Sequence, residues 1–217
     1  PAPRPRKWRR PALGELATPC EAFRAMFCAA LAQAGANARC VARGGDPEYL
    51  HQMRVGLRRL RSALLAFRDL VPRKSAKPIA GRLRVLVPPL GAARDWDVFC
   101  EGLMRIGTQE PARAPAMAPL LARARARRDA ARRRAREAAG SPELQAFLLR
   151  ALRWVHATPR KEHAARVEGA LGAFAAQALE RLHRKALKQA HGIDWHDARA
   201  RHRLRIRMKR LRYGCDF

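Results

Sequence analysis

The sequence predicts an all-α protein, and three observations support that prediction. From Cys20 to the end the chain is rich in alanine, leucine and arginine, which favour helices, and it has almost no runs of β-branched residues. Apolar and polar residues do not alternate anywhere as they do along a half-buried strand. Helix boundary signals separate the apolar segments, for example Gly44-Gly45 followed by Asp46 and Pro47.

Proline and serine positions mark further boundaries. Pro72 follows the second expected helix and cannot continue it, and Ser141-Pro142 places a capping residue before a proline in the first turn of a later one. The expected helices cover residues 20–43, 47–71, 75–88, 93–106, 112–139, 142–157, 161–191 and 195–215.

Length and composition indicate one helical domain preceded by a linker. Residues 1–19 contain five of the fifteen prolines and five Lys or Arg, with little apolar periodicity. We therefore expect a basic, Pro-rich linker over residues 1–19 and one domain over residues 20–217. Because the chain begins without methionine and stops soon after the basic residues 202–212, we also expect it to be a piece of a longer protein.

The charge of the chain points to a polyanionic partner. It carries 46 Lys and Arg against 18 Asp and Glu, a formal net charge of +28. Self-repulsion at that level destabilises a compact state, so the excess is best explained by a negatively charged ligand. Nucleic acid, inorganic polyphosphate and an anionic membrane surface are the three classes to consider.

Several other classes are disfavoured. No run of about 18 apolar residues could form a transmembrane helix, and no apolar segment follows the basic N-terminal residues as in a signal peptide. The cysteines show no CxxC pairing and mostly lie among apolar residues, which is typical of buried, reduced thiols in a cytoplasmic protein. They are Cys20, Cys28, Cys40, Cys100 and Cys215.

The chain contains an internal repeat of eleven residues. HQMRVGLRRLR at 51–61 returns as HRLRIRMKRLR at 202–212, with five positions identical and four conservative. The matches include the histidine and the apolar positions, which abundant arginine alone would not produce. Two copies of one helix predict an internal pseudo-two-fold arrangement.

Each copy of the repeat carries a line of basic residues beside an apolar stripe. At 100° per residue, His51 and the three arginines that follow it at steps of 3, 4 and 3 lie within about 80° of one another, over roughly 15 Å of helix. Met53, Leu57, Leu60, Leu64 and Phe67 form the apolar stripe of the first copy, and Leu204, Met208 and Leu211 that of the second. We call the basic lines the ridges; they are His51, Arg54, Arg58 and Arg61, and His202, Arg205, Lys209 and Arg212.

A solvated helix face is the ordinary explanation of a charge run, but the ridges have unusual properties. They contain no Asp or Glu that could form i,i+4 pairs, so their like charges repel, and each begins with a histidine. A multivalent anion would reverse the repulsion, because each arginine offers two parallel donors to phosphate oxygens. If both ridges face inward, they line a basic central cleft or channel in a helical bundle.

The motifs resemble those of the CHAD domain, a helical family named for its characteristic histidines. His51 to Phe67 is similar to the family pattern HxxRVxxRRLRSxLxxF, and His202 to Tyr213 to HxLRIxxKRLRY. LGAARDWDVF at 90–99 resembles the LGxxRDxDV segment of the family, and Asn37 lies where the family tends to have asparagine. The similarity spans about residues 20–217. The chain stops at Phe217 without a second-half counterpart of LGAARDWDVF, so compared with the family we expect a second lobe that is truncated or small.

The resemblance implies a helical bundle that binds long-chain inorganic polyphosphate without catalysis, and so targets or regulates an attached or partner protein. It also implies that the chain could follow a CYTH-type triphosphatase domain and associate with polyphosphate granules in the cytoplasm. The binding residues carried over by position are His51, Arg54, Arg58, Arg61, Arg94, His202, Arg205, Lys209 and Arg212.

Other residues could suggest metal or acid–base chemistry. Asp95 and Asp97 follow Arg94 shortly after Gly91, and we interpret them either as charges at a helix start or, preferably, as partners that hold basic side chains of the channel in place. The histidines of the C-terminal part lack the i,i+4 spacing of a two-ligand helix face, so we expect no metal site and no cofactor. They are His183, His191, His196 and His202.

Two alternatives stay open at this point. The arginine-rich segment 121–136 is either a solvated arm or an outer docking surface for polyanions. Sequence-nonspecific nucleic-acid binding competes with polyphosphate binding, but a single-strand binder needs exposed rings for stacking. Apart from Trp8, we place the rings in apolar phase: Phe23, Phe27, Phe67, Phe99, Phe147 and Phe174.

Overall fold

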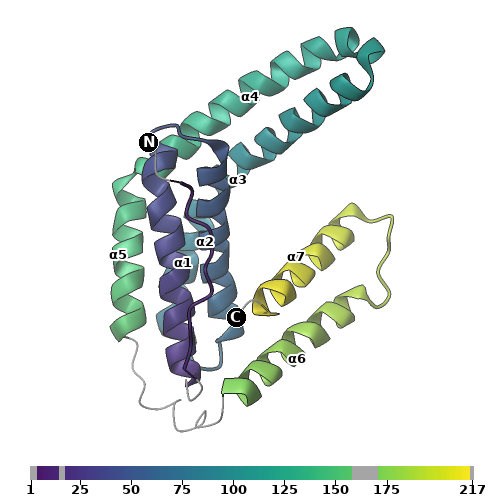
Figure 1. Cartoon of the computed structure of the whole chain (residues 1–217). Coiled ribbons are helices and arrows are strands. Elements are labelled where there is room, and N and C mark those ends of the chain that lie inside the picture. Colours follow the sequence, from purple (N-terminus) through teal and green to yellow (C-terminus); the bar gives the residue numbers. More distant parts are fainter. Residues whose placement is uncertain (1–3, 15–17, 158–170, 216–217) are drawn as a thin grey trace. The chain divides into compact units, whose positions relative to one another are not determined.

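Figure 1 shows the computed structural model of the chain, which describes residues 4–14, 18–157 and 171–215. Within these ranges the chain is helical and contains no strand, so the predicted all-α helical bundle is confirmed. The helices are α1 (Pro19–Ala42), α2 (Pro47–Ala66), α3 (Arg73–Gln109), the short 3-10 helix η1 (Pro111–Arg113), α4 (Ala114–Gly140), α5 (Pro142–Ala157), α6 (Leu171–Ala190) and α7 (Ala198–Cys215).

The boundary signals act as the sequence predicts. Gly44 adopts a φ of 77°, the left-handed conformation with which many helices end. Asp46 accepts a hydrogen bond from the backbone N–H of Glu48 at 2.7 Å, and Ser141 accepts one from that of Leu144 at 3.2 Å. These side chains satisfy amide groups that the first turns of α2 and α5 leave without a helical partner.

Three expected boundaries need correction, and one expected helix start lies outside the described residues. Helix α2 ends at Ala66 and continues into turns instead of reaching residue 71. η1 precedes α4, which therefore begins at Ala114 and not at residue 112. The first part of the helix expected over 161–191 lies outside the described residues, and α7 begins at Ala198, after a cap at Asp197.

The two helices expected over 75–88 and 93–106 are one helix, α3. Pro88 and Pro89 suggested a break, because a proline inside a helix removes a hydrogen bond and costs about 3 kcal/mol. Leu83 and Leu90, seven residues apart across the prolines, are both fully buried. A continuous helix keeps these side chains on one apolar face, and their burial offsets the cost of the prolines.

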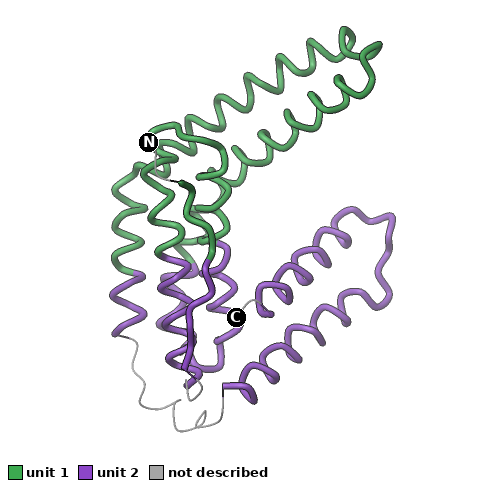
Figure 2. The backbone as a smooth tube through the Cα atoms, in the orientation of Figure 1, with its two compact units in different colours: residues 1–8, 32–57, 81–150 green, residues 9–31, 58–80, 151–217 purple. Residues whose placement is uncertain are grey.

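The chain divides into two compact units (Figure 2). Unit 1 comprises residues 1–8, 32–57 and 81–150, and unit 2 comprises residues 9–31, 58–80 and 151–217.

In unit 1, the C-terminal part of α3 and α4 run antiparallel and form a helical hairpin (Figure 1). Cys100, Leu103 and Ala124 make its core, against which Trp96 and Leu121 pack. The buried residues of α4 are all alanines, so this arginine-rich helix packs through a narrow face and exposes most of its arginines. The segment 121–136 is thus an ordered helix.

A buried ion pair joins α3 and α4. The carboxylate of Asp97 is almost fully inaccessible, and its Oδ1 accepts a hydrogen bond from Nε of Arg132 at 2.7 Å. Asp97 was expected to hold a basic residue of the binding site, and instead it holds a residue of the hairpin. A buried carboxylate needs such a partner, because its desolvation is costly.

In unit 2, an aromatic cluster forms the core. The ring of Phe23 lies 5.5 Å from that of Phe27 and 5.4 Å from that of Phe67, and Phe67 stacks on Phe174 at 5.4 Å. Trp154 lies 5.4 Å from Phe27. These contacts connect α1, α5 and α6 with the residues that follow α2.

Helices α6 and α7 form an antiparallel pair within unit 2 (Figure 1). They approach closely at Gly214, where an added Cβ would lie only 2.8 Å from Cδ1 of Leu182. A larger residue at this position would force the Leu182 side chain or the helix to shift, so glycine permits the close approach.

The described residues contain no helix that is both long and apolar enough to cross a membrane. The five cysteines are free. Cys100 is buried as expected, whereas Cys215 is exposed and departs from that expectation.

Replacing Arg132 with alanine should lower the free energy of unfolding by about 3 kcal/mol, because the buried Asp97 charge loses its partner. Asp97→Asn should cost less, since it removes the buried charge while Arg132 can still reach solvent. Chemical denaturation followed by circular dichroism measures both losses. A larger loss for Asp97→Asn would contradict this account of the ion pair.

Candidate functional site

The apolar stripe of α2 determines where its ridge faces. Met53, Leu57 and Leu60 are fully buried, as the sequence predicts. The ridge lies beside this stripe, so its side chains reach the surface: Arg61 is exposed, and Arg58 is partly buried. Packing of the apolar stripe thus orients the basic residues of the first repeat.

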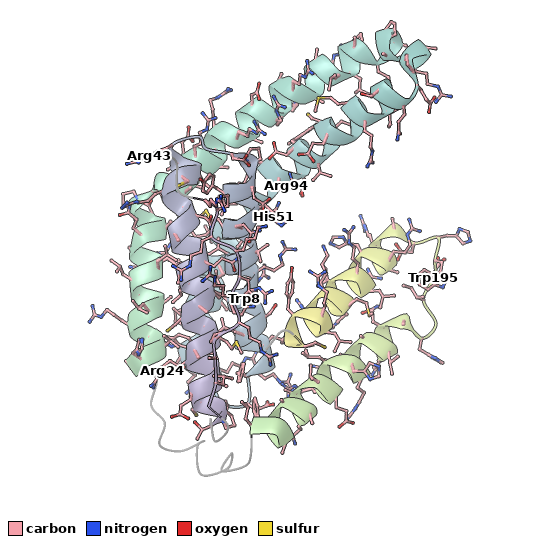
Figure 3. The ribbon with its side chains drawn as sticks, viewed as in Figure 1. Trp8, Arg24, Arg43, His51, Arg94 and Trp195 are labelled. Atoms are coloured by element: carbon pink, nitrogen blue, oxygen red, sulfur yellow. The ribbon has the colours of Figure 1, made fainter. Side chains whose placement is uncertain are left out.

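Three residues of the predicted site lie in unit 1: His51, Arg54 and Arg94. Figure 3 labels His51 and Arg94. Nη2 of Arg54 lies 3.8 Å from Oδ1 of Asp95, and Nη1 of Arg94 donates to Oε1 of Glu101 at 3.2 Å. Arg94 and Asp95 lie in the middle of α3, so the interpretation that they start a helix is wrong. The expectation that Asp95 holds a basic ridge residue is correct, although the exposed carboxylate makes this pair weak.

In unit 2, α7 buries a different set of residues from the one its sequence suggests. Its buried residues are Ala200 and Tyr213, whereas Met208, which was assigned to the apolar stripe, is 52% exposed. Leu204 and Leu211 are partly buried as expected. The ridge residues His202, Arg205 and Arg212 are exposed, and Lys209 is partly buried.

The two repeats meet in unit 2 around the ring of Tyr213. The guanidinium carbons of Arg58, Arg59 and Arg212 lie 5.6, 5.5 and 5.1 Å from the ring centroid. Cations are attracted to the face of an aromatic ring at these distances. A buried tyrosine of α7 therefore collects arginines from both repeat helices at one place.

Further cations crowd this part of unit 2. Burial lowers the pKa of Arg210, and the positive charges of Arg207 and Arg61 lower it further. Burial also lowers the pKa of Lys185 on α6, with added repulsion from Arg68, Arg207 and Arg181. We call Arg58, Arg59, Arg61, Arg207, Arg210 and Arg212 together the Tyr213 cluster.

Asp69 provides negative charge beside these cations. Its Oδ2 accepts a hydrogen bond from Arg181, and its Oδ1 lies 3.3 Å from Nε of Arg68. Burial lowers the pKa of Arg181, and the nearby Asp69 partly compensates. The positive charge of unit 2 thus greatly exceeds what Asp69 can balance.

Sequence reasoning missed Arg59, Arg207 and Arg210. Arg59 is only 8% exposed, and neither it nor Arg210, its counterpart in the second repeat, belongs to a ridge. Tyr213 is the signal that could have identified them, because a tyrosine directly after an arginine-rich helix face can bind several guanidinium groups.

The C-terminal histidines have separate positions. His183, His191, His196 and His202 are all exposed, and the described part of the chain contains no group of three or more His, Cys, Asp or Glu that could hold a metal ion. Asp197, next to His196, accepts a hydrogen bond from the backbone N–H of Arg199 at 2.7 Å. This bond is the main reason that the pKa of Asp197 is lowered, so Asp197 acts as the cap of α7.

Replacing Tyr213 with leucine should destabilise the protein by about 2 kcal/mol, because three cation–π contacts are lost and the arginines repel one another. Tyr213→Phe keeps the ring face and should cost clearly less. Thermal unfolding measures both. If the two variants are equally unstable, the ring does not hold the arginines.

The comparisons with known proteins agree with this architecture. No curated protein matches the chain closely enough to count as a relative. The crystal structure of the CHAD domain from the plant Ricinus communis is similar, with a TM-score of 0.80 and 34% identity over 98% of this chain and 70% of that one. The model of the CHAD domain family matches residues 25–217. The chain belongs to the CHAD domain family.

Proposed function

We propose that the chain binds inorganic polyphosphate through the ridges and the Tyr213 cluster, and that it does not hydrolyse the polymer. The observation that carries the proposal is the Tyr213 cluster, where arginines from both repeats are held together despite their repulsion. Like charges at close range cost free energy unless an anion joins them. An arrangement with this free-energy cost is best explained if the cluster binds a ligand of opposite charge.

A linear polymer of phosphates fits the ridges better than a single phosphate. The ridge of α2 extends over roughly 15 Å, which is several phosphate groups long. Each guanidinium can bind two phosphate oxygens, and contacts along one polymer reinforce one another. We infer that long chains bind more tightly than orthophosphate or triphosphate.

The carboxylates near the ridges support binding without turnover. Asp69 interacts with Arg181 and Arg68, Asp95 with Arg54, and Glu101 with Arg94. Hydrolysis of phosphate anhydrides usually relies on carboxylates that hold divalent metal ions. Here the carboxylates interact with arginines instead, which favours binding over hydrolysis. We further infer that bound polymer targets or regulates an attached or partner protein.

Nucleic-acid binding is the second candidate, and two exposed rings favour it. Phe99 was expected in apolar phase but is 45% exposed, and Trp195 in the loop between α6 and α7 is 62% exposed (Figure 3). Exposed rings can stack on bases. Both rings lie outside the Tyr213 cluster, so we favour polyphosphate as the ligand of the cluster itself.

Arg61→Glu should weaken polyphosphate binding about tenfold and reduce the salt dependence of binding by about one phosphate contact. The same change should raise the melting temperature slightly, because Arg61 repels Arg210 in the free protein. Fluorescence anisotropy with labelled polyphosphate and thermal unfolding give the two readouts. The test is that affinity falls while the melting temperature rises, because simple misfolding would lower both.

Arg153→Glu is the matched control, because Arg153 is exposed on α5. Arg58→Glu and Lys209→Glu should also weaken binding strongly. Arg132 cannot serve as a control, because replacing it leaves the buried Asp97 without this ion pair and destabilises the protein. Equal losses from Arg61→Glu and Arg153→Glu would indicate bulk charge and contradict the proposed site.

Competition separates the two candidate ligands. Duplex DNA at equal phosphate concentration should not displace long-chain polyphosphate from the protein, because the directly linked phosphates of the polymer can approach the arginines more closely than phosphates spaced along a stiff duplex. Phosphate release assayed in the same samples with and without Mg²⁺ should stay at background. Displacement by DNA would favour nucleic acid, and metal-dependent release would make the chain an enzyme.

Binding of polyphosphate should take up protons at alkaline pH, below the ordinary titration range of a lysine. The pKa of Lys185 is lowered in the free protein, and a nearby anion favours the charged amine and raises that pKa again. Calorimetry in buffers of different ionisation enthalpy measures the uptake. Lys185→Arg should reduce it, and an unchanged uptake in this variant would mean that the polymer does not approach Lys185.

A further inference from the structure

Asn37 anchors the N-terminal segment of the chain to α1 within unit 1. Its Oδ1 accepts a hydrogen bond from the backbone N–H of Arg6 at 3.1 Å, and its Nδ2 donates to the carbonyl of Arg6 at 3.0 Å. Asn37 is fully buried, and Nδ2 also donates to the carbonyl of Gln33 at 2.7 Å. The amide group thus pairs with the backbone of residue 6 as a neighbouring strand would.

The segment 4–14, which we call the strap, has its side chains sorted by polarity. It contains no regular secondary structure, and it contains no Asp or Glu. Its partly buried residues are Pro5, Trp8, Pro11 and Leu13, and all of its cations are exposed. These cations are Arg4, Arg6, Lys7, Arg9 and Arg10. The apolar side chains therefore pack inward, and the strap displays five positive charges to solvent.

We propose that the docked strap is a second binding element for polyphosphate, in addition to the two ridges. The strap precedes the residues matched by the family model, which begin at residue 25. This inference rests on the proposed function for the identity of the ligand. The anchor at Asn37 and the polarity of the strap are observations independent of the Tyr213 cluster.

Docking of the strap makes its charges more effective. A free basic tail loses conformational entropy when it binds a polymer, at roughly 1 kcal/mol or more per ordered backbone residue. A tail already anchored at Asn37 has lost part of that freedom on folding, so the contacts it makes contribute more to affinity. The hydrogen bonds of Asn37 thus act on binding through pre-organisation.

The hydrogen bonds between Asn37 and residue 6 involve only the backbone of residue 6, so the anchor and the charge of Arg6 can be tested separately. Arg6→Ala removes one charge but keeps both backbone hydrogen bonds to Asn37. Arg6→Pro removes the same charge and also the N–H donor. We expect trypsin to cleave after Arg9 faster in Arg6→Pro than in Arg6→Ala, and polyphosphate to bind several-fold more weakly to the proline variant.

The charge of the strap is tested with the full chain and a matched control. The strap variant carries Arg4→Gln, Lys7→Gln, Arg9→Gln and Arg10→Gln. The control removes the same number of charges from exposed arginines of α4 and α5, with Arg133→Gln, Arg134→Gln, Arg150→Gln and Arg153→Gln. The strap variant should bind labelled polyphosphate about tenfold more weakly than the control and show the smaller salt dependence.

The outcomes separate the strap from the proposed function. If the wild-type chain does not bind polyphosphate, the proposed function fails. If the wild type binds and Arg61→Glu weakens binding, but the strap variant equals its control, only the inference about the strap fails. It also fails if Arg6→Pro is cleaved no faster than Arg6→Ala, or is cleaved faster but binds equally well.

Discussion

The attraction of several arginines to the ring of Tyr213 is the interaction on which the architecture of the site depends. Without it, guanidinium groups from α2 and α7 would be driven apart by their own charge. Burial makes the arrangement possible, because a ring face in a low-dielectric setting attracts cations more strongly than one in water. The helices must be positioned by other contacts before the ring can act.

Those other contacts are apolar. The stripe of Met53, Leu57 and Leu60 orients α2, and the aromatic cluster around Phe67 surrounds the residues that follow it. Small residues set the closest approaches, with alanines on α4 and a glycine on α7. A chain of +28 can fold in this way because most of the charge lies on faces that these contacts leave exposed.

Periodicity and boundary signals predicted the helices well, because capping and turn chemistry are local. The same local rules failed at Pro88-Pro89, where burial of Leu83 and Leu90 on a continuous face decides the outcome. The ridge of α2 follows from its strong apolar stripe. The burial of Arg59 and the exposure of Met208 could not be predicted in this way. They depend on the contact of Arg59 with Tyr213 and on the face that α7 turns to α6, which are tertiary properties.

The close approach at Gly214 has an electrostatic consequence. This glycine is the immediate neighbour of Tyr213, and it lies against Leu182 with no room for a methyl group. A larger side chain here would require either the Leu182 side chain or the last turn of α7 to move, and movement of the turn would shift the adjacent ring. Such a shift of the ring would weaken its attraction for the arginines around it, so a steric change at Gly214 would increase the repulsion among these charges.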